Sequence, residues 1–324
     1  MNWPWPAGAA TGIGSLPGTD IVDAVAFVFG ELPDLPFLPE LPRRGPGADL
    51  LGRTAALLVD LPVEVYANRW RLAARPGRDL RAARDLWARD LDTLTDQAAG
   101  YTGPLKVQAA GAYTLAAGLE LPVGGVVLRD PGAVRELAAS LAEGLRAHVA
   151  DVTKRVPGAS VLLQLDEPSL PAVLAGTVPT ESGFGALRAV EESTAQDTLA
   201  GLVSAAGVPV IVHCCAADVP VRLIKDAGAA ALALDLDLVG DLDSLGEAVD
   251  GGLGLVAGAV AAGTTAPAAA DRIRDLWHRL GFPADRLAAQ VVVSSACGLA
   301  GLTADRARAV LTACREAGRR LRED

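Results

Sequence analysis

The chain has 324 residues, of which 51% are hydrophobic and 21% charged, so it can bury the core of one large α/β barrel or of two modest domains. A formal net charge of −10 and an aromatic content of 4% argue against a nucleic-acid partner. The N-terminus has no signal-peptide pattern, and no apolar stretch reaches the roughly 18 residues of a membrane span. We therefore expect no membrane partner and a cytoplasmic protein, whose four cysteines stay reduced.

Short apolar runs alternate with helical stretches along most of the chain. The later runs are apolar on both alternating faces, which is typical of parallel strands covered on both sides. Residues 62–73 are predicted to form a hairpin or an extended excursion. The predicted strands span residues 11–15, 36–41, 105–111, 160–168, 208–215, 230–238, 252–260 and 290–298.

The helical stretches show apolar residues at steps of three and four. Asp130 is a predicted N-cap, and Gly207 a predicted C-cap. Cys314 lies on a core-facing helical stripe, whereas His148 and His278 are expected at the surface. The predicted helices span residues 78–99, 131–155, 186–206, 267–280 and 303–321.

Eight strands, most of them followed by a helix, predict a (β/α)8 TIM-type barrel, with a doubly wound sheet as the alternative. We expect residues 1–324 to form a single catalytic barrel domain with a short N-terminal extension over about residues 1–10. The pair Trp3 and Trp5 in that extension is interpreted either as an arm or as a plug in the barrel floor.

Metal-ligand residue types follow three of the late strands. His213 and Cys215 lie two residues apart, so in an extended chain their side chains point the same way. Asp235 follows the next apolar run and Cys297 follows the last one. Because strand ends of a barrel meet at one rim, these four residues predict a zinc site, with Asp237 as the rival of Asp235. A structural His–Cys pair and a turn-capping aspartate are the alternatives.

Such a thiolate-rich zinc site suits one kind of chemistry. Metal coordination deprotonates a thiol near neutral pH, and an electron-rich ligand shell keeps that thiolate nucleophilic. The composition of the site therefore favours alkyl transfer to sulfur over activation of water.

Three further segments carry candidate polar groups. Asp166 and Glu167 are neighbours at a strand end and face opposite sides, so one could bind a substrate ammonium while the other is structural or caps a helix. In residues 11–18 the proline and glycine that follow Ser15 exclude a dinucleotide-binding turn. Ser15 is predicted to present its hydroxyl to a substrate carboxylate, with a plain turn as the alternative, and Glu40 is similarly placed.

Taken together, these segments resemble the C-terminal catalytic barrel of cobalamin-independent methionine synthases. The resemblance covers most of the chain. It is most specific in the segments IGSLP (13–17), LDEPSL (165–170), VHCC (212–215) and ACGL (296–299). It implies a methyltransferase that acts on the thiol of homocysteine and gives methionine. It also implies a Zn²⁺ ion bound by His213, Cys215, Asp235 and Cys297, with Asp235 in the place of a glutamate.

The resemblance also implies a substrate site. Ser15, Glu40 and Asp166 match positions that bind the amino-acid part of homocysteine, and Asp166 is our candidate catalytic residue. In the loop after the seventh predicted strand, Ala261 and its neighbours replace an Asp- and His-bearing segment of the family. The methyl donor therefore stays open between a folate and a corrinoid. Corrinoid-dependent transfer to another small thiol and a non-catalytic zinc- or thiol-binding barrel are the alternative functions.

Overall fold

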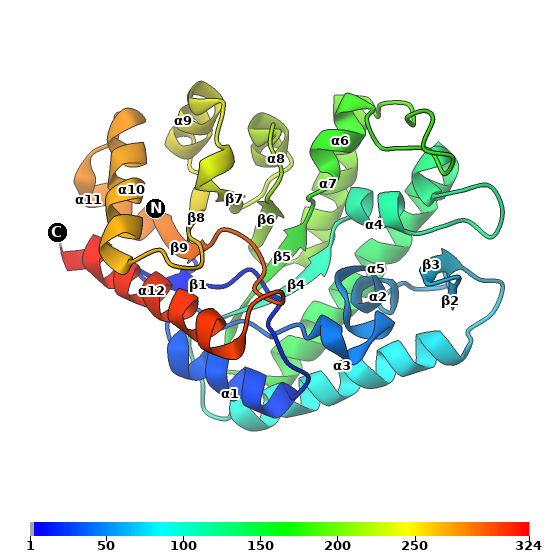
Figure 1. Ribbon diagram of the computed structural model, residues 1–324, viewed down its shortest axis with the longest axis horizontal. Helices are drawn as coiled ribbons and strands as arrows, with labels where there is room; N and C mark the ends of the chain where they lie inside the picture. The colour runs from blue at the N-terminus through cyan, green and yellow to red at the C-terminus, as the bar shows by residue number, and fades with distance from the viewer. Residues whose placement is uncertain (1–2, 324) are drawn as a thin grey trace.

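A computed structural model describes residues 3–323. Its main sheet has seven parallel strands in the order β1-β9-β8-β7-β6-β5-β4 (Figure 1). The strands are β1 (Ala10–Thr11), β4 (Pro104–Ala110), β5 (Ser160–Asp166), β6 (Val210–Cys214), β7 (Ala231–Asp235), β8 (Gly254–Val260) and β9 (Val291–Ser295). From β4 to β9 the spatial order follows the chain without reversal, so the doubly wound alternative is wrong. The sheet is curled, as in a TIM-like fold.

The segment expected as the second strand, residues 36–41, is not a strand. It makes isolated parallel bridges instead, with Phe37 opposite Lys106 on one side and Glu40 opposite Ser15 on the other. Prolines at positions 36 and 39 lack the N–H groups that a continuous ladder needs. Residues 36–40 therefore lie between the two edge regions of the sheet without forming a regular strand.

The predicted hairpin at residues 62–73 is confirmed as an antiparallel pair of β2 (Val63–Tyr66) and β3 (Arg69–Leu72). It lies outside the main sheet (Figure 1).

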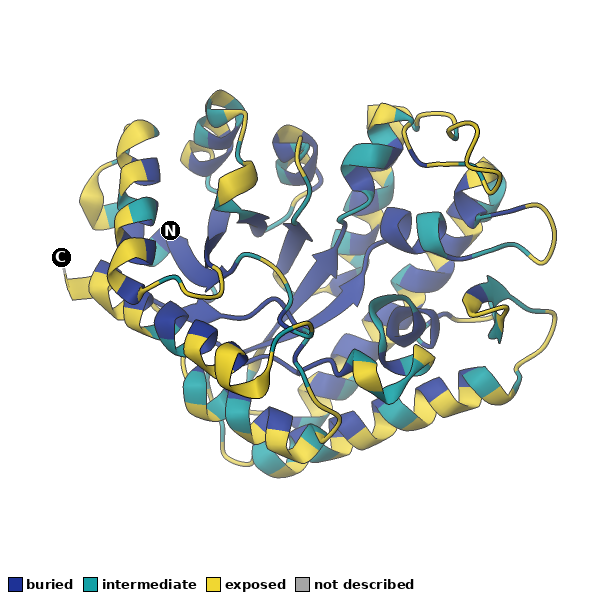
Figure 2. Ribbon diagram, in the orientation of Figure 1, coloured by how far each residue is buried: buried dark blue, intermediate teal, exposed yellow. Residues whose placement is uncertain are grey.

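Helices cover the outer face of the sheet, and the buried residues concentrate in the strands (Figure 2). Their bounds are α1 (Ile21–Glu31), α2 (Leu50–Ala55), α3 (Arg78–Gln97), α4 (Ala112–Gly118), α5 (Pro131–Arg155), α6 (Leu170–Ala175), α7 (Glu192–Ala206), α8 (Val221–Asp226), α9 (Leu242–Asp250), α10 (Ala266–Arg279), α11 (Ala284–Gln290) and α12 (Ala304–Glu323). None of these helices is both long enough and apolar enough to cross a bilayer.

Helix-end chemistry explains which predicted bounds hold. The Asp130 side chain accepts hydrogen bonds from two backbone N–H groups in the first turn of α5, and Gly207 ends α7 in the left-handed conformation, both as predicted. However, α7 begins at Glu192 rather than at residue 186, because Ala186 is paired in a bridge with Pro179.

Three predictions about side-chain burial have different outcomes. Cys314 is fully buried in the core, as expected, and His278 is exposed. His148 is only 5% exposed, so its predicted surface position is wrong. Its ring packs against Trp87 of α3 at 4.6 Å between centroids, because α3 covers that face of α5.

A smaller apolar cluster fills the inner side of the sheet. It includes Trp5, Ile211 of β6 and Val256 of β8. A Cβ atom added at Gly254, the first residue of β8, would lie 2.6 Å from the Trp5 ring. Trp5 thus packs at the start of the strands, which supports the plug interpretation, and Trp3 stacks on it at 5.6 Å.

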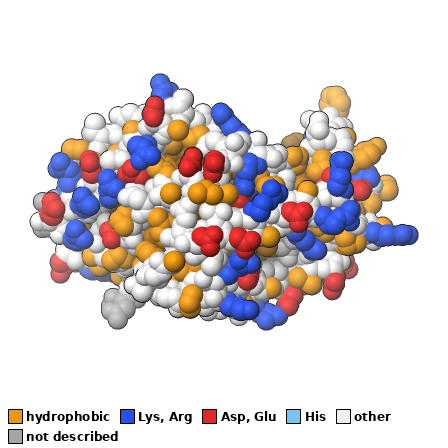
Figure 3. Space-filling view, turned by 90° about the horizontal axis from the view of Figure 1, so that it is seen from below, with side chains coloured by type: hydrophobic (Ala, Val, Ile, Leu, Met, Phe, Trp, Pro, Cys, Tyr) orange, Lys and Arg blue, Asp and Glu red, His pale blue; other side chains and the backbone are white. Residues whose placement is uncertain are grey.

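One face of the molecule mixes charges of both signs. On the face seen in Figure 3, basic and acidic side chains are interspersed with apolar ones. This face therefore presents no large field of one sign that would favour a polyanion.

Candidate active site

Two buried polar side chains meet at the ends of neighbouring strands. Asp166 ends β5 and lies opposite His213 of β6 in the parallel register, so both side chains point into the inner side of the sheet. The His213 Nδ1 atom lies 2.6 Å from Asp166 Oδ1. The other ring nitrogen, Nε2, is buried without a hydrogen-bond partner. An unpartnered imidazole nitrogen next to a carboxylate-bound one is the arrangement that metal-ligating histidines use.

Two cysteines from distant strands are in contact beside this pair. Cys215 directly follows β6 and Cys297 follows β9, yet their Sγ atoms lie 3.5 Å apart. Since β7 and β8 lie between these strands, the contact depends on the curl of the sheet. The interaction with Cys215 and the nearby His213 lower the pKa of Cys297, whereas the shared hydrogen bond and burial raise the pKa of Cys215.

The two acidic candidates for the fourth ligand are engaged elsewhere. Asp235 ends β7 and accepts a hydrogen bond from the backbone N–H of Asp237 at 2.9 Å. Asp237 itself is exposed and forms an ion pair with Arg272 at 2.5 Å. Within residues 3–323, no group of three or more His, Cys, Asp or Glu side chains is arranged to hold a metal ion. The structure brings Cys215 and Cys297 together beside His213, and it does not join Asp235 to them.

Ser15 and Glu40 are neighbours at the same rim. They are bridge partners, with the Glu40 N–H donating to Gly14 O at 3.0 Å. Gly298, which directly follows Cys297, packs so close that an added Cβ atom would lie 2.2 Å from Ser15 Oγ. An alanine at position 298 would therefore force the Ser15 hydroxyl out of this position.

Glu40 lies in a pocket of mixed charge. Its side chain is almost fully buried, and burial raises its pKa to about 7. The Nε atom of Arg53 lies 3.8 Å from Glu40 Oε1 and lowers that pKa, while the negative charge of Asp166 raises it further. The buried charges of Arg53 and Lys106 offset part of the negative charge of these two carboxylates.

Glu167 has a structural task, which is one of the two assignments that the sequence left open for this pair. It accepts hydrogen bonds from the backbone N–H groups of Tyr113 and Thr114 and from the Thr114 hydroxyl, at 2.8–3.0 Å. It thus caps the first turn of α4 and ties β5 to the loop after β4. Gly111 makes room for it, because a Cβ atom there would lie 2.2 Å from Glu167 Oε1.

Sequence reasoning missed several buried polar residues near the site. Lys106 and Gln108 on β4 and Gln164 on β5 were counted within apolar runs, but all three are at most 2% exposed and lie on the inner side. Strand alternation was the available signal, since Gln164 lies two residues before Asp166 and on the same face of β5. Lys106 and Gln108 lie on the same face of β4 as Ala110, the register partner of Asp166. Arg53 was missed as well, because nothing near it in the chain marks it as buried.

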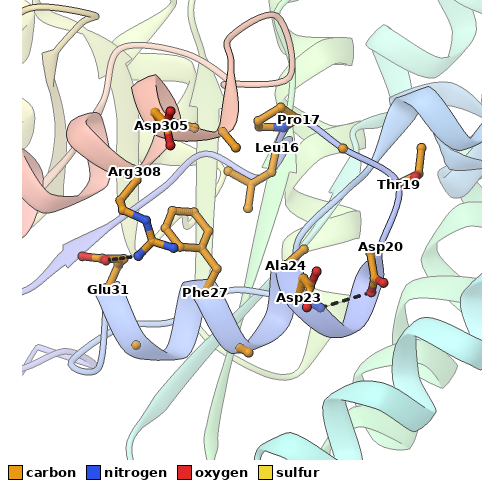
Figure 4. Close-up of a pocket in the computed structure, with 15 residues that line it drawn as sticks. Leu16, Pro17, Thr19, Asp20, Asp23, Ala24, Phe27, Glu31, Asp305 and Arg308 are labelled. Carbon is orange, nitrogen blue, oxygen red and sulfur yellow. Dashed lines mark hydrogen bonds and ion pairs between the residues drawn. The ribbon is translucent and has the colours of Figure 1, made fainter.

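A separate cavity of about 710 Å³ lies between α1 and α12. Figure 4 shows Arg308 reaching Glu31 beside the Phe27 ring, with Leu16 and Pro17 on the opposite wall. None of the predicted site residues lines this cavity. It therefore has no part in the site built from the strand ends.

Comparisons with known proteins identify the family and the fold. The sequence model of the family described as "Cobalamin-independent synthase, Catalytic domain" matches residues 9–320. The fold is similar to that of a B12-independent methionine synthase from Shewanella sp. W3-18-1 solved with selenomethionine, at 13% identity and a TM-score of 0.64 over 98% of both chains. It is also similar to a methyltransferase from Methanosarcina mazei, at 15% identity and a TM-score of 0.58 over 97% of this chain and 94% of that one. No curated protein matches the sequence.

Proposed function

Because the chain belongs to the family of cobalamin-independent synthase catalytic domains, we propose that it is a zinc-dependent methyltransferase that converts homocysteine to methionine. Membership of this methionine synthase-like methyltransferase family is the starting point, and the identity of the metal and of the thiol is the proposal. The observation that carries it is the 3.5 Å contact between Cys215 and Cys297 beside the unpartnered Nε2 atom of His213.

The donor chemistry at this place fits a zinc ion. Two thiols and a neutral imidazole are the ligand types that zinc prefers. We assign Cys215, Cys297 and His213 as ligands and keep Asp235 as the proposed fourth. Asp237 is the weaker rival, because it is exposed and paired with Arg272. Zinc bound there would keep a substrate thiol deprotonated near neutral pH.

The remaining residues would hold the amino acid. Asp166 uses Oδ1 to accept from His213, which leaves Oδ2 for a substrate ammonium. Glu40 would supply the second negative charge, and a bound ammonium would favour its ionised form despite burial. The Ser15 hydroxyl, fixed against Gly298, would donate to the substrate carboxylate.

The closed barrel is part of the same proposal. We infer that residues 36–40 complete the ring between β4 and the segment after β1, through the bridges at Lys106 and Ser15. The whole chain would then form one catalytic barrel domain. Glu40 and Ser15 would then lie on the same rim as the cysteines, with Ser15 next to Gly298, the residue after Cys297.

The methyl donor is either a folate or a corrinoid. One observation favours the corrinoid as donor. The loop after β8 carries neither Asp nor His between residues 261 and 265, and it is closed on itself by a hydrogen bond from the Ala261 N–H to Thr264 Oγ1 at 3.1 Å.

The test is a side-by-side assay of the purified protein loaded with zinc. Homocysteine and a second small thiol are each offered methyltetrahydrofolate or methylcobalamin as donor. We expect methionine from homocysteine with one donor, abolished in Cys297→Ser and retained in Cys314→Ala, whose thiol lies in the core of α12. Turnover of the second thiol alone would refute the homocysteine assignment. Tight thiol binding without turnover on either donor would favour a non-catalytic barrel.

A further inference from the structure

A row of buried polar side chains crosses the inner side of the sheet from β4 to β6. Lys106 Nζ donates to Gln164 Oε1 at 2.7 Å, and Gln164 Nε2 donates to Asp166 Oδ1 at 2.7 Å. Asp166 Oδ1 in turn contacts His213 Nδ1 at 2.6 Å. The backbone carbonyl of Ile13 accepts from both Lys106 Nζ and Gln164 Nε2 at 2.8 Å. All four side chains are at most 5% exposed.

From this row we propose that Lys106 and Gln164 are positioning residues that hold His213 in the tautomer with its proton on Nδ1. The tautomer leaves the Nε2 lone pair free. The consequence for metal binding rests on the proposed function, whereas the tautomer itself does not.

The polarity of the row follows from the kinds of group in it. An ammonium group has only donors, so the Gln164 atom that faces Lys106 must be the carbonyl oxygen. The Gln164 amide nitrogen must then face both Ile13 O and Asp166 Oδ1, which are acceptors. The flipped amide would set oxygen against two acceptors and nitrogen against an ammonium, so all of these contacts require the same orientation.

The last contact in the row fixes the imidazole. Asp166 Oδ1 accepts from the Gln164 amide nitrogen, so it is the acceptor for its other neighbour as well. The His213 nitrogen beside it must therefore be the donor. Nδ1 carries the proton, and Nε2, which is buried without a partner, keeps its lone pair.

The ammonium that starts the row is sustained by its surroundings. Burial lowers the pKa of Lys106 to about 8, and the negative charges of Asp166 and Glu40 act against that fall. The charged form therefore prevails at neutral pH. Removing the Lys106 ammonium from water costs folding free energy, and its two hydrogen bonds offset part of that cost. An apolar side chain would fill the same space without this cost.

The test combines two readouts on metal-free and zinc-loaded protein. Two-bond ¹H–¹⁵N spectra of histidine-labelled metal-free protein report the tautomer of each of the three histidines, and His213→Gln identifies the His213 signals. A competing chelator dye gives the zinc dissociation constant. Lys106→Met and Gln164→Met break the row at two points. Gln290→Met is the matched control, since Gln290 is equally buried but donates only to Val249 O and Leu253 O.

We expect pure Nδ1–H in the wild-type protein and in the Gln290→Met control. We expect an Nε2–H population in both row variants, with zinc binding weakened about 10-fold, the lower end of what outer-shell changes cost. Nε2–H in the wild-type protein would overturn the proposal whatever the variants do. The proposal would also be overturned if either row variant, shown by circular dichroism to be folded, kept pure Nδ1–H and an unchanged zinc affinity. If the wild-type protein binds no zinc, the proposed function fails, while the tautomer measurement still decides this inference.

Discussion

A buried cluster of Asp90, Arg44 and Arg53 allows the stability of a charge-removing variant to be predicted. Asp90 has no exposed surface and accepts three hydrogen bonds from two guanidinium groups. Arg44 contributes a bidentate pair at 2.6 and 2.7 Å, and Arg53 contributes a third contact at 2.5 Å. Removing the negative charge in Asp90→Asn would leave two positive charges in the interior with one neutral acceptor between them.

The expected cost follows from breaking a buried ion pair on one side only. Such changes destabilise by about 3–5 kcal/mol, because the remaining charge stays desolvated. A loss of about 4 kcal/mol corresponds to a fall of roughly 6 °C in Tm for a chain of this length. Differential scanning calorimetry and urea unfolding measure both quantities.

The control is an ion pair of similar length on the surface. Arg222 and Glu247 also approach to 2.6 Å, but both side chains are more than 60% exposed. Glu247→Gln should change the free energy of unfolding by less than about 1 kcal/mol. Equal effects of Asp90→Asn and Glu247→Gln would refute the reasoning, because burial would then make no difference to the value of the charge.

Two further predictions concern the substrate pocket. Gly298→Ala should raise the KM for the thiol substrate at least about 10-fold with little change in fold, since the new methyl group displaces the Ser15 hydroxyl; an unchanged KM would remove Ser15 from the site. Glu40→Gln should stabilise the protein more at pH 8 than at pH 5. Burial raises the pKa of Glu40 from 4.5 to about 7, so the free-energy cost of keeping this carboxylate in the folded protein grows as the pH rises between those values. The difference between the two pH values should be about 2–3 kcal/mol in urea unfolding, and an equal effect at both would show that burial does not raise the pKa of Glu40.

The sequence predicted the strands and the helix ends well where local chemistry decides them. The apolar runs and the Asp130 cap needed no tertiary information. Residues 36–41 were predicted as a strand from their apolar character, but the prolines at 36 and 39 restrict them to isolated bridges. His148 was expected at the surface but is buried. The amphipathic pattern of its helix does not reveal that a second helix covers the face on which it lies.

The candidate site was predicted as a set of positions rather than as a network. The ends of parallel strands meet at one edge, so Asp166, His213 and the two cysteines could be placed together from the chain alone. The sequence could not give the direct Asp166–His213 contact, because it depends on side-chain direction. It left a capping role for Asp235 as an alternative, and the hydrogen bond from the Asp237 N–H is of that kind. Lys106 is a single charged residue within an apolar run, so the apolar character of the run does not reveal its role.

X-ray absorption at the zinc edge, with and without homocysteine, probes the proposed metal site itself. We expect one zinc ion per chain with two sulfur ligands at about 2.3 Å, from Cys215 and Cys297, and a third sulfur when homocysteine is added. Absence of bound zinc, or a sulfur count that homocysteine leaves unchanged, would contradict it.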